Sequence, residues 1–125
     1  ADDADVAVHA VIDSLLGAAA LGDCGTHFPS GDLKYAGARS VELLRQAVAM
    51  IGDAGYRVVN VDCTVVAERP SLAPFVGKMR DELAAAIGVD AKRISVKAKR
   101  TEGLGFTGSG DGIEAYAVAL VEERS

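Results

Sequence analysis

The sequence is poor in the residues that build disulfide scaffolds and multi-ligand metal centres. Its 125 residues include no tryptophan, two cysteines and two histidines. Cys24 and Cys63 are too few for a disulfide framework or a four-thiolate zinc site, and Cys63 lies in an apolar run that favours packing in a core. His9 and His27 are too few for a three-histidine metal site within one chain. We expect both cysteines to be packing residues.

Long apolar runs and an excess of positive charge are also missing. No window of 18 consecutive apolar residues occurs, and Asp2, Asp3 and Asp5 stand where a signal peptide would begin with basic residues. These features predict a cytoplasmic protein with no membrane partner. Thirteen Lys and Arg against 18 Asp and Glu give a net charge of −5, which repels a phosphate backbone. We therefore expect no nucleic-acid partner.

What the sequence does contain fits one packed domain. A length of 125 residues and a hydrophobic content of 50% suffice for a single hydrophobic core. No linker, charge block or internal repeat divides the chain, so residues 1–125 are expected to form one domain. Segment 23–37 collects Gly, Pro, Ser and Asp, and it is predicted to be a long connection within that domain.

Three segments carry apolar residues at helical spacing. They predict helices over about residues 5–21, 41–54 and 76–87. Ser40 is the predicted N-cap of the second helix. The three helices are predicted to end at glycines, namely Gly22, Gly55 and Gly88.

Three other segments alternate apolar and polar residues, which is typical of strands. They cover residues 56–67, 93–100 and 113–121, and the first is rich in β-branched residues. The resulting order favours an α/β (α+β) domain in which a small sheet carries three main helices on one face. Three strands make a small sheet for so apolar a chain. We expect the sheet to be completed by self-association or by chain that precedes residue 1.

Asp5, His9 and Asp13 recur at intervals of four residues, which places them on one stripe of the first helix. A histidine flanked by carboxylates can bind a metal through one ring nitrogen while a carboxylate holds the proton of the other. The alternative is a solvated, capped start of a helix. His27 is predicted to be a surface or packing residue.

The glycine-rich segment 103–108 matches the G-x-G-x-x-G pattern of dinucleotide-binding loops. That fingerprint requires a helix to begin immediately after it, whereas residues 109–112 lead into a strand pattern. We therefore interpret the segment as a flexible or anion-contacting loop. Just before it stand three cations and a carboxylate: Lys97, Lys99, Arg100 and Glu102. This combination suits a phosphate with its divalent ion, and an exposed strand end with an ion pair is the alternative.

Several longer motifs occur in order along the chain. They are Asp3-Ala4-Asp5-Val6 with His9-Ala10 and Asp13, Leu15 to Gly25, His27-Phe28-Pro29, Gly55-Tyr56, Asn60-Val61-Asp62 and Glu102 to Gly108. Together they closely resemble the family of 2-C-methyl-D-erythritol 2,4-cyclodiphosphate synthase. The resemblance spans the whole chain, so it is far more specific than any single spacing described above.

The resemblance implies a homotrimer with active sites between adjacent subunits, working in the non-mevalonate pathway of isoprenoid biosynthesis. Its location would be the cytoplasm, or the plastid stroma in a plastid-bearing organism. In the implied reaction, the 2-phosphate of a cytidine diphosphate-linked methylerythritol attacks the β-phosphorus, which closes a cyclic diphosphate and releases cytidine monophosphate. An internal nucleophile of this kind needs positioning and charge neutralisation rather than a nucleophile from the protein.

The resemblance also implies roles for individual residues. His9 would be a zinc (Zn2+) ligand, and Glu102 would hold a second divalent ion, Mg2+ or Mn2+, between the substrate phosphates. Arg100 and Glu102 would be the catalytic residues. The implied substrate-binding positions are Asp2; Asp23, Cys24, Gly25, Phe28, Pro29, Ser30, Gly31 and Asp32; Ala67, Ser71, Leu72, Ala73, Ala98, Lys99 and Arg100; and Thr101, Phe106 and Ser109.

The sequence also departs from the family pattern. The family's strand with an Asp-x-His pair, which supplies two more zinc ligands, would precede residue 1, so the zinc site is expected to be incomplete in this chain. Ala1-Asp2 stands where His-Ser is usual, Ser71 replaces a lysine, and Ser109 replaces an arginine. Lys99-Arg100 stands where Thr-Thr is common. The alternative is therefore a non-catalytic trimeric scaffold or a nucleotide-binding remnant of the same fold.

Overall fold

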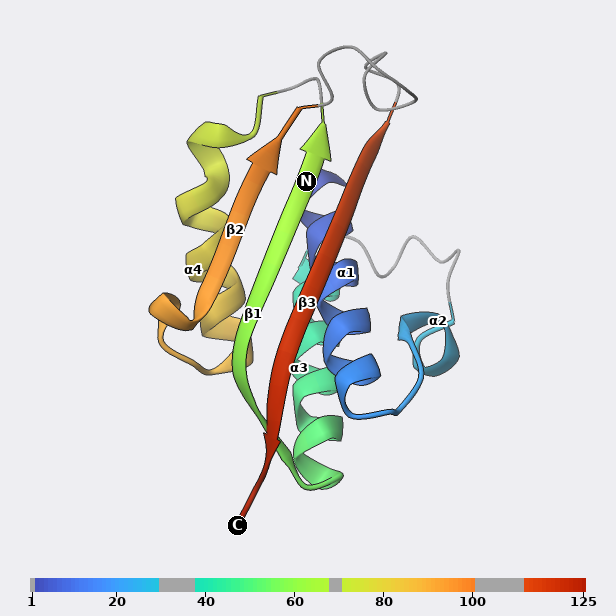
Figure 1. Ribbon diagram of the computed structural model, residues 1–125. Helices are drawn as coiled ribbons and strands as arrows, with labels where there is room; N and C mark the ends of the chain where they lie inside the picture. Colours follow the sequence, from blue (N-terminus) through green and yellow to red (C-terminus); the bar gives the residue numbers. More distant parts are fainter. Residues whose placement is uncertain (1, 30–37, 68–70, 101–111) are drawn as a thin grey trace.

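The chain folds into a layer of strands backed by a layer of helices (Figure 1). The computed structural model describes residues 2–29, 38–67, 71–100 and 112–125. The elements follow in the order α1 (Asp2–Ala18), α2 (Cys24–His27), α3 (Ala38–Asp53), β1 (Tyr56–Ala67), α4 (Val76–Ile87), β2 (Ile94–Lys99) and β3 (Ile113–Glu123), with short 3-10 turns at Ala73–Phe75 and Ala91–Arg93. This confirms the predicted α+β class with three main helices on one face of a small sheet.

The strand β1 forms the centre of the sheet. The strand order is β2-β1-β3, with β2 parallel and β3 antiparallel to β1. Because β1 and β2 are parallel, they end at the same edge of the sheet, where Val65 lies opposite Ala98 and Val66 opposite Lys99. The last residues of both strands therefore lie side by side, and this edge becomes one part of the candidate site.

The hydrophobic core lies between the sheet and the helices α1, α3 and α4. In β1, Val61, Cys63 and Val65 are buried, whereas Asp62 between them is exposed. Val61 and its neighbours pack against fully buried helix residues, among them Ile12, Leu15, Leu16, Leu44 and Ile51. The predicted alternation is thus confirmed over residues 61–67, and so is the burial of Cys63. Nearer the start of β1 the prediction was wrong, because a register shift between Val58 and Asn60 interrupts the alternation and Val58, rather than Val59, packs against the core.

The predicted bounds agree with the structure for β1 and α4, and they differ at the end of α1. The helix stops at Ala18 rather than Leu21. Ala20 then takes a left-handed conformation with φ 59°, and the Leu21 N–H donates to the Leu16 carbonyl at 2.8 Å. This is the bond pattern that usually places glycine at the left-handed position, so the sequence signal at Gly22 misled the prediction. Gly22, two residues after Ala20, also has a positive φ of 97°, as do Gly55 at 97° and Gly88 at 85°.

Two further predictions about the helices were wrong. Ser40 is not the N-cap of the second helix, because α3 begins at Ala38 and Ser40 lies fully buried within its first turn. The segment predicted as one long connection contains the short helix α2. The rest of that connection, residues 30–37, lies outside the described residues. None of the described helices is long and apolar enough to cross a membrane.

Candidate functional site

The Asp5-His9-Asp13 stripe lies along α1 as predicted, and its two carboxylates bond to other elements. The Asp13 Oδ1 accepts the Cys24 backbone N–H at 2.7 Å, and the Asp5 Oδ1 accepts the Ser40 hydroxyl at 2.7 Å. The first bond joins α1 to α2, and the second joins α1 to α3. His9 lies between them and its side chain is exposed. The two carboxylates therefore hold neighbouring helices in place.

The α2 turn is shaped by hydrogen bonds around Asp23. Its Oδ1 accepts both the backbone N–H of Thr26 at 2.8 Å and the Thr26 hydroxyl at 2.7 Å, which makes Asp23 the N-cap of the helix. The bond from the Thr26 hydroxyl, followed by the one from its N–H, lowers the pKa of the Asp23 carboxyl. Asp23 therefore keeps its charge to a lower pH than an unbonded aspartate would.

Residues on both sides of α2 tie the turn to the rest of the chain. A ring nitrogen of His27 lies 2.6 Å from the Leu21 carbonyl oxygen, and the exposed His27 confirms the expectation of a surface residue. The Phe28 N–H donates to the Cys24 carbonyl at 2.7 Å, and the Phe28 ring is buried in the core. Cys24 is half-buried, which raises the pKa of its thiol, and the charges of Asp13 and Asp23 raise it further.

A pocket of about 100 Å³ lies at the shared edge where β1 and β2 end. It is lined by Ala67, Ser71, Leu72, Ala73, Ala98, Lys99 and Arg100. The structure thus gathers seven of the predicted substrate-binding positions around one space. Three alanines keep its walls small, and two cations stand at the end of β2. Within the described part of the chain, Lys99 has no carboxylate partner.

The α2 turn and this pocket lie far apart in one chain. In Figure 1, α2 lies at the right, whereas β1 and β2 end at the top beside the start of α4. The α2 turn is therefore separated, within one chain, from the pocket at the ends of β1 and β2.

Other predicted positions cannot be placed. Those outside the described residues are Ser30, Gly31, Asp32, Thr101, Glu102, Phe106 and Ser109, and the side chain of Asp2 is not described either. The glycine-rich segment 103–108 also lies outside them. Among the described residues, no group of three or more His, Cys, Asp or Glu side chains could hold a metal ion. Of the predicted metal ligands only His9 can be placed, and the described residues do not by themselves form a zinc site.

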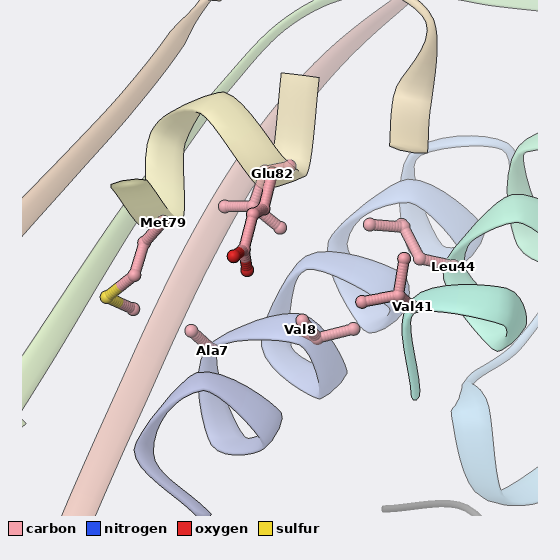
Figure 2. Close-up of a pocket in the computed structure, with 7 residues that line it drawn as sticks. Ala7, Val8, Val41, Leu44, Met79 and Glu82 are labelled. Carbon is pink, nitrogen blue, oxygen red and sulfur yellow. The ribbon is translucent and has the colours of Figure 1, made fainter. Parts of the chain in front are cut away.

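A second hollow lies on the helix side of the molecule, and Figure 2 shows the side chains around it. It is lined by Ala7, Val8, Val41, Leu44, Met79, Glu82 and Leu83. Its volume is about 10 Å³, which corresponds to roughly one water molecule. This hollow is a small packing gap between α1, α3 and α4, and it is too small for a substrate.

Sequence reasoning missed the contact between Asp13 and Cys24. It also missed α2, although Asp23 three residues before Thr26 is a recognisable cap signal. The Asp13 partner is a backbone N–H 11 residues away in sequence, and side-chain patterns carry no information about such a donor. The stripe was visible in the sequence, whereas its partners were not.

The fold and the small-walled, cationic pocket define a compact α+β domain suited to a phosphate-bearing ligand. The model of the YgbB family matches residues 1–122, and the chain belongs to this family. It is 55% identical over 122 residues to the 2-C-methyl-D-erythritol 2,4-cyclodiphosphate synthase of Symbiobacterium thermophilum, covering 98% of this chain and 78% of the relative. The resemblance inferred from the motifs is confirmed.

Two solved structures also superpose on this chain. The bifunctional IspDF from Campylobacter jejuni superposes with a TM-score of 0.88 at 37% identity, over 94% of this chain and 32% of that protein. This chain thus spans about a third of the bifunctional relative. The IspF protein of Plasmodium falciparum, solved as a CDP complex, superposes with a TM-score of 0.83 at 31% identity, over 96% of this chain and 72% of that one.

Proposed function

We propose that this chain forms the 2,4-cyclodiphosphate of methylerythritol from a cytidine diphosphate-linked precursor. An oxygen of the precursor's 2-phosphate attacks the β-phosphorus, and the bond from that phosphorus to the bridging oxygen breaks, so that cytidine monophosphate leaves. The observation that carries the proposal is the pocket at the ends of β1 and β2, in a chain of the same family and fold as a protein solved with CDP.

The pocket has features suited to a cytidine nucleotide. Alanine walls allow a planar base to come close to the backbone, where a few directed hydrogen bonds can recognise it. Lys99 and Arg100 bring two positive charges to the pocket, which suits the diphosphate. Ser71 supplies a hydroxyl at a position where a lysine would add a third charge.

We assign the ribose side of the ligand to the α2 turn. The Asp23 Oδ1 already accepts two hydrogen bonds from Thr26, whereas no hydrogen bond to Oδ2 occurs within the described residues. The Gly25 N–H lies in the first turn of α2, among the donors that a helix start leaves without a partner inside the helix. An acceptor and a donor of this kind on an exposed turn can bind a pair of hydroxyl groups.

We further propose that the chain is a homotrimer in which the α2 turn of one copy meets the pocket of the next. The uncovered face of the sheet supports self-association. Tyr116, Val118 and Leu120 alternate along β3 on this face and are 60%, 73% and 54% exposed. Large apolar side chains gathered on an open sheet face mark an interaction surface.

We also propose two kinds of metal site. His9 would contribute to a Zn2+ site and Glu102 would hold Mg2+ or Mn2+, which neutralises the phosphates during the attack. Because the described residues supply His9 alone, we expect these 125 residues to bind zinc weakly. Metal analysis of the purified chain before and after His9→Ala tests this. Tight, stoichiometric zinc that is lost in the variant would contradict the expectation.

Turnover is the direct test of the proposed reaction. The purified chain is incubated with the cytidine diphosphate-linked substrate and Mg2+, with and without added Zn2+, and phosphorus NMR follows the products. We expect cytidine monophosphate and the cyclic diphosphate to appear in equal amounts. Nucleotide binding without release of cytidine monophosphate, even with both metals present, would contradict catalysis by this chain.

A further inference from the structure

The bond between Asp13 and Cys24 fixes α2 relative to α1. The Asp13 carboxylate accepts the first N–H of the α2 helix at 2.7 Å, across 11 residues of sequence. That N–H belongs to the group of donors at a helix start that have no partner within the helix. A carboxylate supplied by another helix therefore satisfies a donor of α2 and also sets where the turn lies.

The other bonds of this turn have a different effect. The Asp23–Thr26 bonds are internal to the turn, and the His27–Leu21 contact spans six residues of the same segment. These contacts give the turn its shape and do not attach it to the side of α1. Phe28 anchors the far end of the turn in the core. Asp13 holds the near end, next to Asp23 and Gly25.

The position of Asp13 on α1 links this bond to the rest of the site. Asp13 follows His9 by four residues, so both side chains lie on one face of the helix about one turn apart. The helix that carries the proposed zinc ligand thus also positions the proposed ribose-binding turn. We propose that Asp13 is a positioning residue, which holds the Asp23–Gly25 turn in its binding geometry by accepting the Cys24 N–H. This inference rests on the proposed function.

The role depends on an acceptor at the end of a short side chain. An asparagine at position 13 retains an oxygen that can accept the Cys24 N–H, whereas an alanine does not. Comparison of Asp13→Asn with Asp13→Ala therefore separates hydrogen bonding from charge. Ser14→Ala is the matched control, because the Ser14 hydroxyl donates to the Val11 carbonyl at 2.7 Å within α1. It removes a bond of the same length that does not reach α2.

The first arm of the experiment measures the affinity for CDP by calorimetry in the presence of Mg2+. We expect Asp13→Ala to weaken binding about fivefold, which corresponds to a lost hydrogen bond of about 1 kcal/mol. Asp13→Asn and Ser14→Ala should stay within about twofold of the parent chain, since neither removes the bond to α2. Equal affinity for Asp13→Ala and the parent would overturn the proposal. So would an Asp13→Asn variant as weak as Asp13→Ala.

The second arm needs no ligand and keeps the two proposals distinguishable. Amide hydrogen exchange is measured at Cys24 and Thr26 in the same four proteins. We expect faster exchange at both amides in Asp13→Ala, and exchange like that of the parent in Asp13→Asn and Ser14→Ala. If the parent fails to bind CDP, the proposed function is wrong and this arm still decides whether Asp13 holds the turn. Unchanged exchange at both amides in Asp13→Ala would show that it does not.

Discussion

The two faces of the sheet are built from the same strands and differ in what covers them. On the inner face, Val61, Cys63 and Val65 are buried under the helices, so the chain completes this face by itself. On the outer face, which points toward the viewer in Figure 1, no described element covers Tyr116, Val118 and Leu120. The strand alternation that builds the core therefore also builds a second apolar surface, which supports the proposed self-association.

The outer face combines this apolar stripe with ion pairs. The Lys97 ammonium lies 2.9 Å from the Asp62 carboxylate, and Arg57 lies 2.6 Å from Glu122. Asp62 is the strand partner of Val118, so charged and apolar side chains are neighbours on this face. In the proposed homotrimer, the surface of the neighbouring copy must match both the apolar side chains and the charges.

The largest effect is expected from a cavity in the inner layer. Leu44 is fully buried against the core, so Leu44→Ala should lower the free energy of unfolding by about 2–5 kcal/mol. Denaturant unfolding measures this change. Gln46→Ala, at an exposed position of the same helix, should change it by less than about 0.5 kcal/mol. Equal effects of the two substitutions would contradict the assignment of the inner layer as the core.

The next largest effect concerns the outer face. Val118→Asp places a charge in the middle of the apolar stripe, where burial of an unpaired charge costs several kcal/mol. Light scattering should show a mass of three chains for the parent and one for the variant, with circular dichroism unchanged. Ala49→Asp, on an exposed position of α3, should remain trimeric. A parent that is a stable monomer at micromolar concentration would refute the trimer.

A smaller effect is expected at the ion pair of the outer face. Lys97 and Asp62 are about half exposed in the single chain, so their pair should be worth at most about 1 kcal/mol there. Lys97→Ala introduced into a Leu120→Asp chain should thus change the free energy of unfolding by no more than that amount. Leu120→Asp disrupts the same apolar stripe, and its new charge lies opposite Asn60 rather than opposite Asp62 of the ion pair. In the assembled parent it should cost more, because the Asp62 charge is left buried without its partner. Equal costs in both backgrounds would mean that assembly does not cover this pair.

The smallest expected effect is a difference in reactivity between the two thiols, Cys24 and Cys63. Burial, followed by the charge of Asp62, raises the pKa of Cys63 to about 11, whereas Cys24 is only half-buried. A thiol reagent at pH 8 should modify Cys24 well before Cys63. Asp13→Asn removes one of the charges that raise the pKa of Cys24, so the pH dependence of Cys24 modification should move to lower pH. Mass spectrometry of the labelled chain measures the order in which the thiols react. Modification of Cys63 before Cys24 would contradict the expected order.

Much of the fold could be predicted because local patterns determine it. The alternation of 56–67 and the glycines at positions 55 and 88 placed β1 and the ends of α3 and α4 within a residue or two. The end of α1 was misjudged because a left-handed Ala20, rather than a glycine, terminates the helix. Ser40 was misjudged because its hydroxyl bonds to Asp5 across 35 residues, and a tertiary contact of this kind overrides a capping preference.

The candidate site was less accessible to local reasoning. The pocket positions came from the resemblance as a whole, because Ala67, Ala73 and Ala98 carry no chemical signal of their own. The parallel pairing of β1 with β2 brings them together, and a pairing partner cannot be deduced from either strand alone. The charged stripe of α1 stood out in the sequence, and only the tertiary structure assigned its carboxylates to Cys24 and Ser40.

NMR titration with CDP and Mg2+ shows whether the pocket at the ends of β1 and β2 binds a cytidine nucleotide. We predict saturable shifts of the Ala67, Ser71 and Ala73 amides, with the affinity reduced about tenfold in Lys99→Ala by loss of a charge-assisted contact. Shifts that cluster away from these residues, or no shifts at millimolar CDP, would show that this pocket is not the nucleotide site.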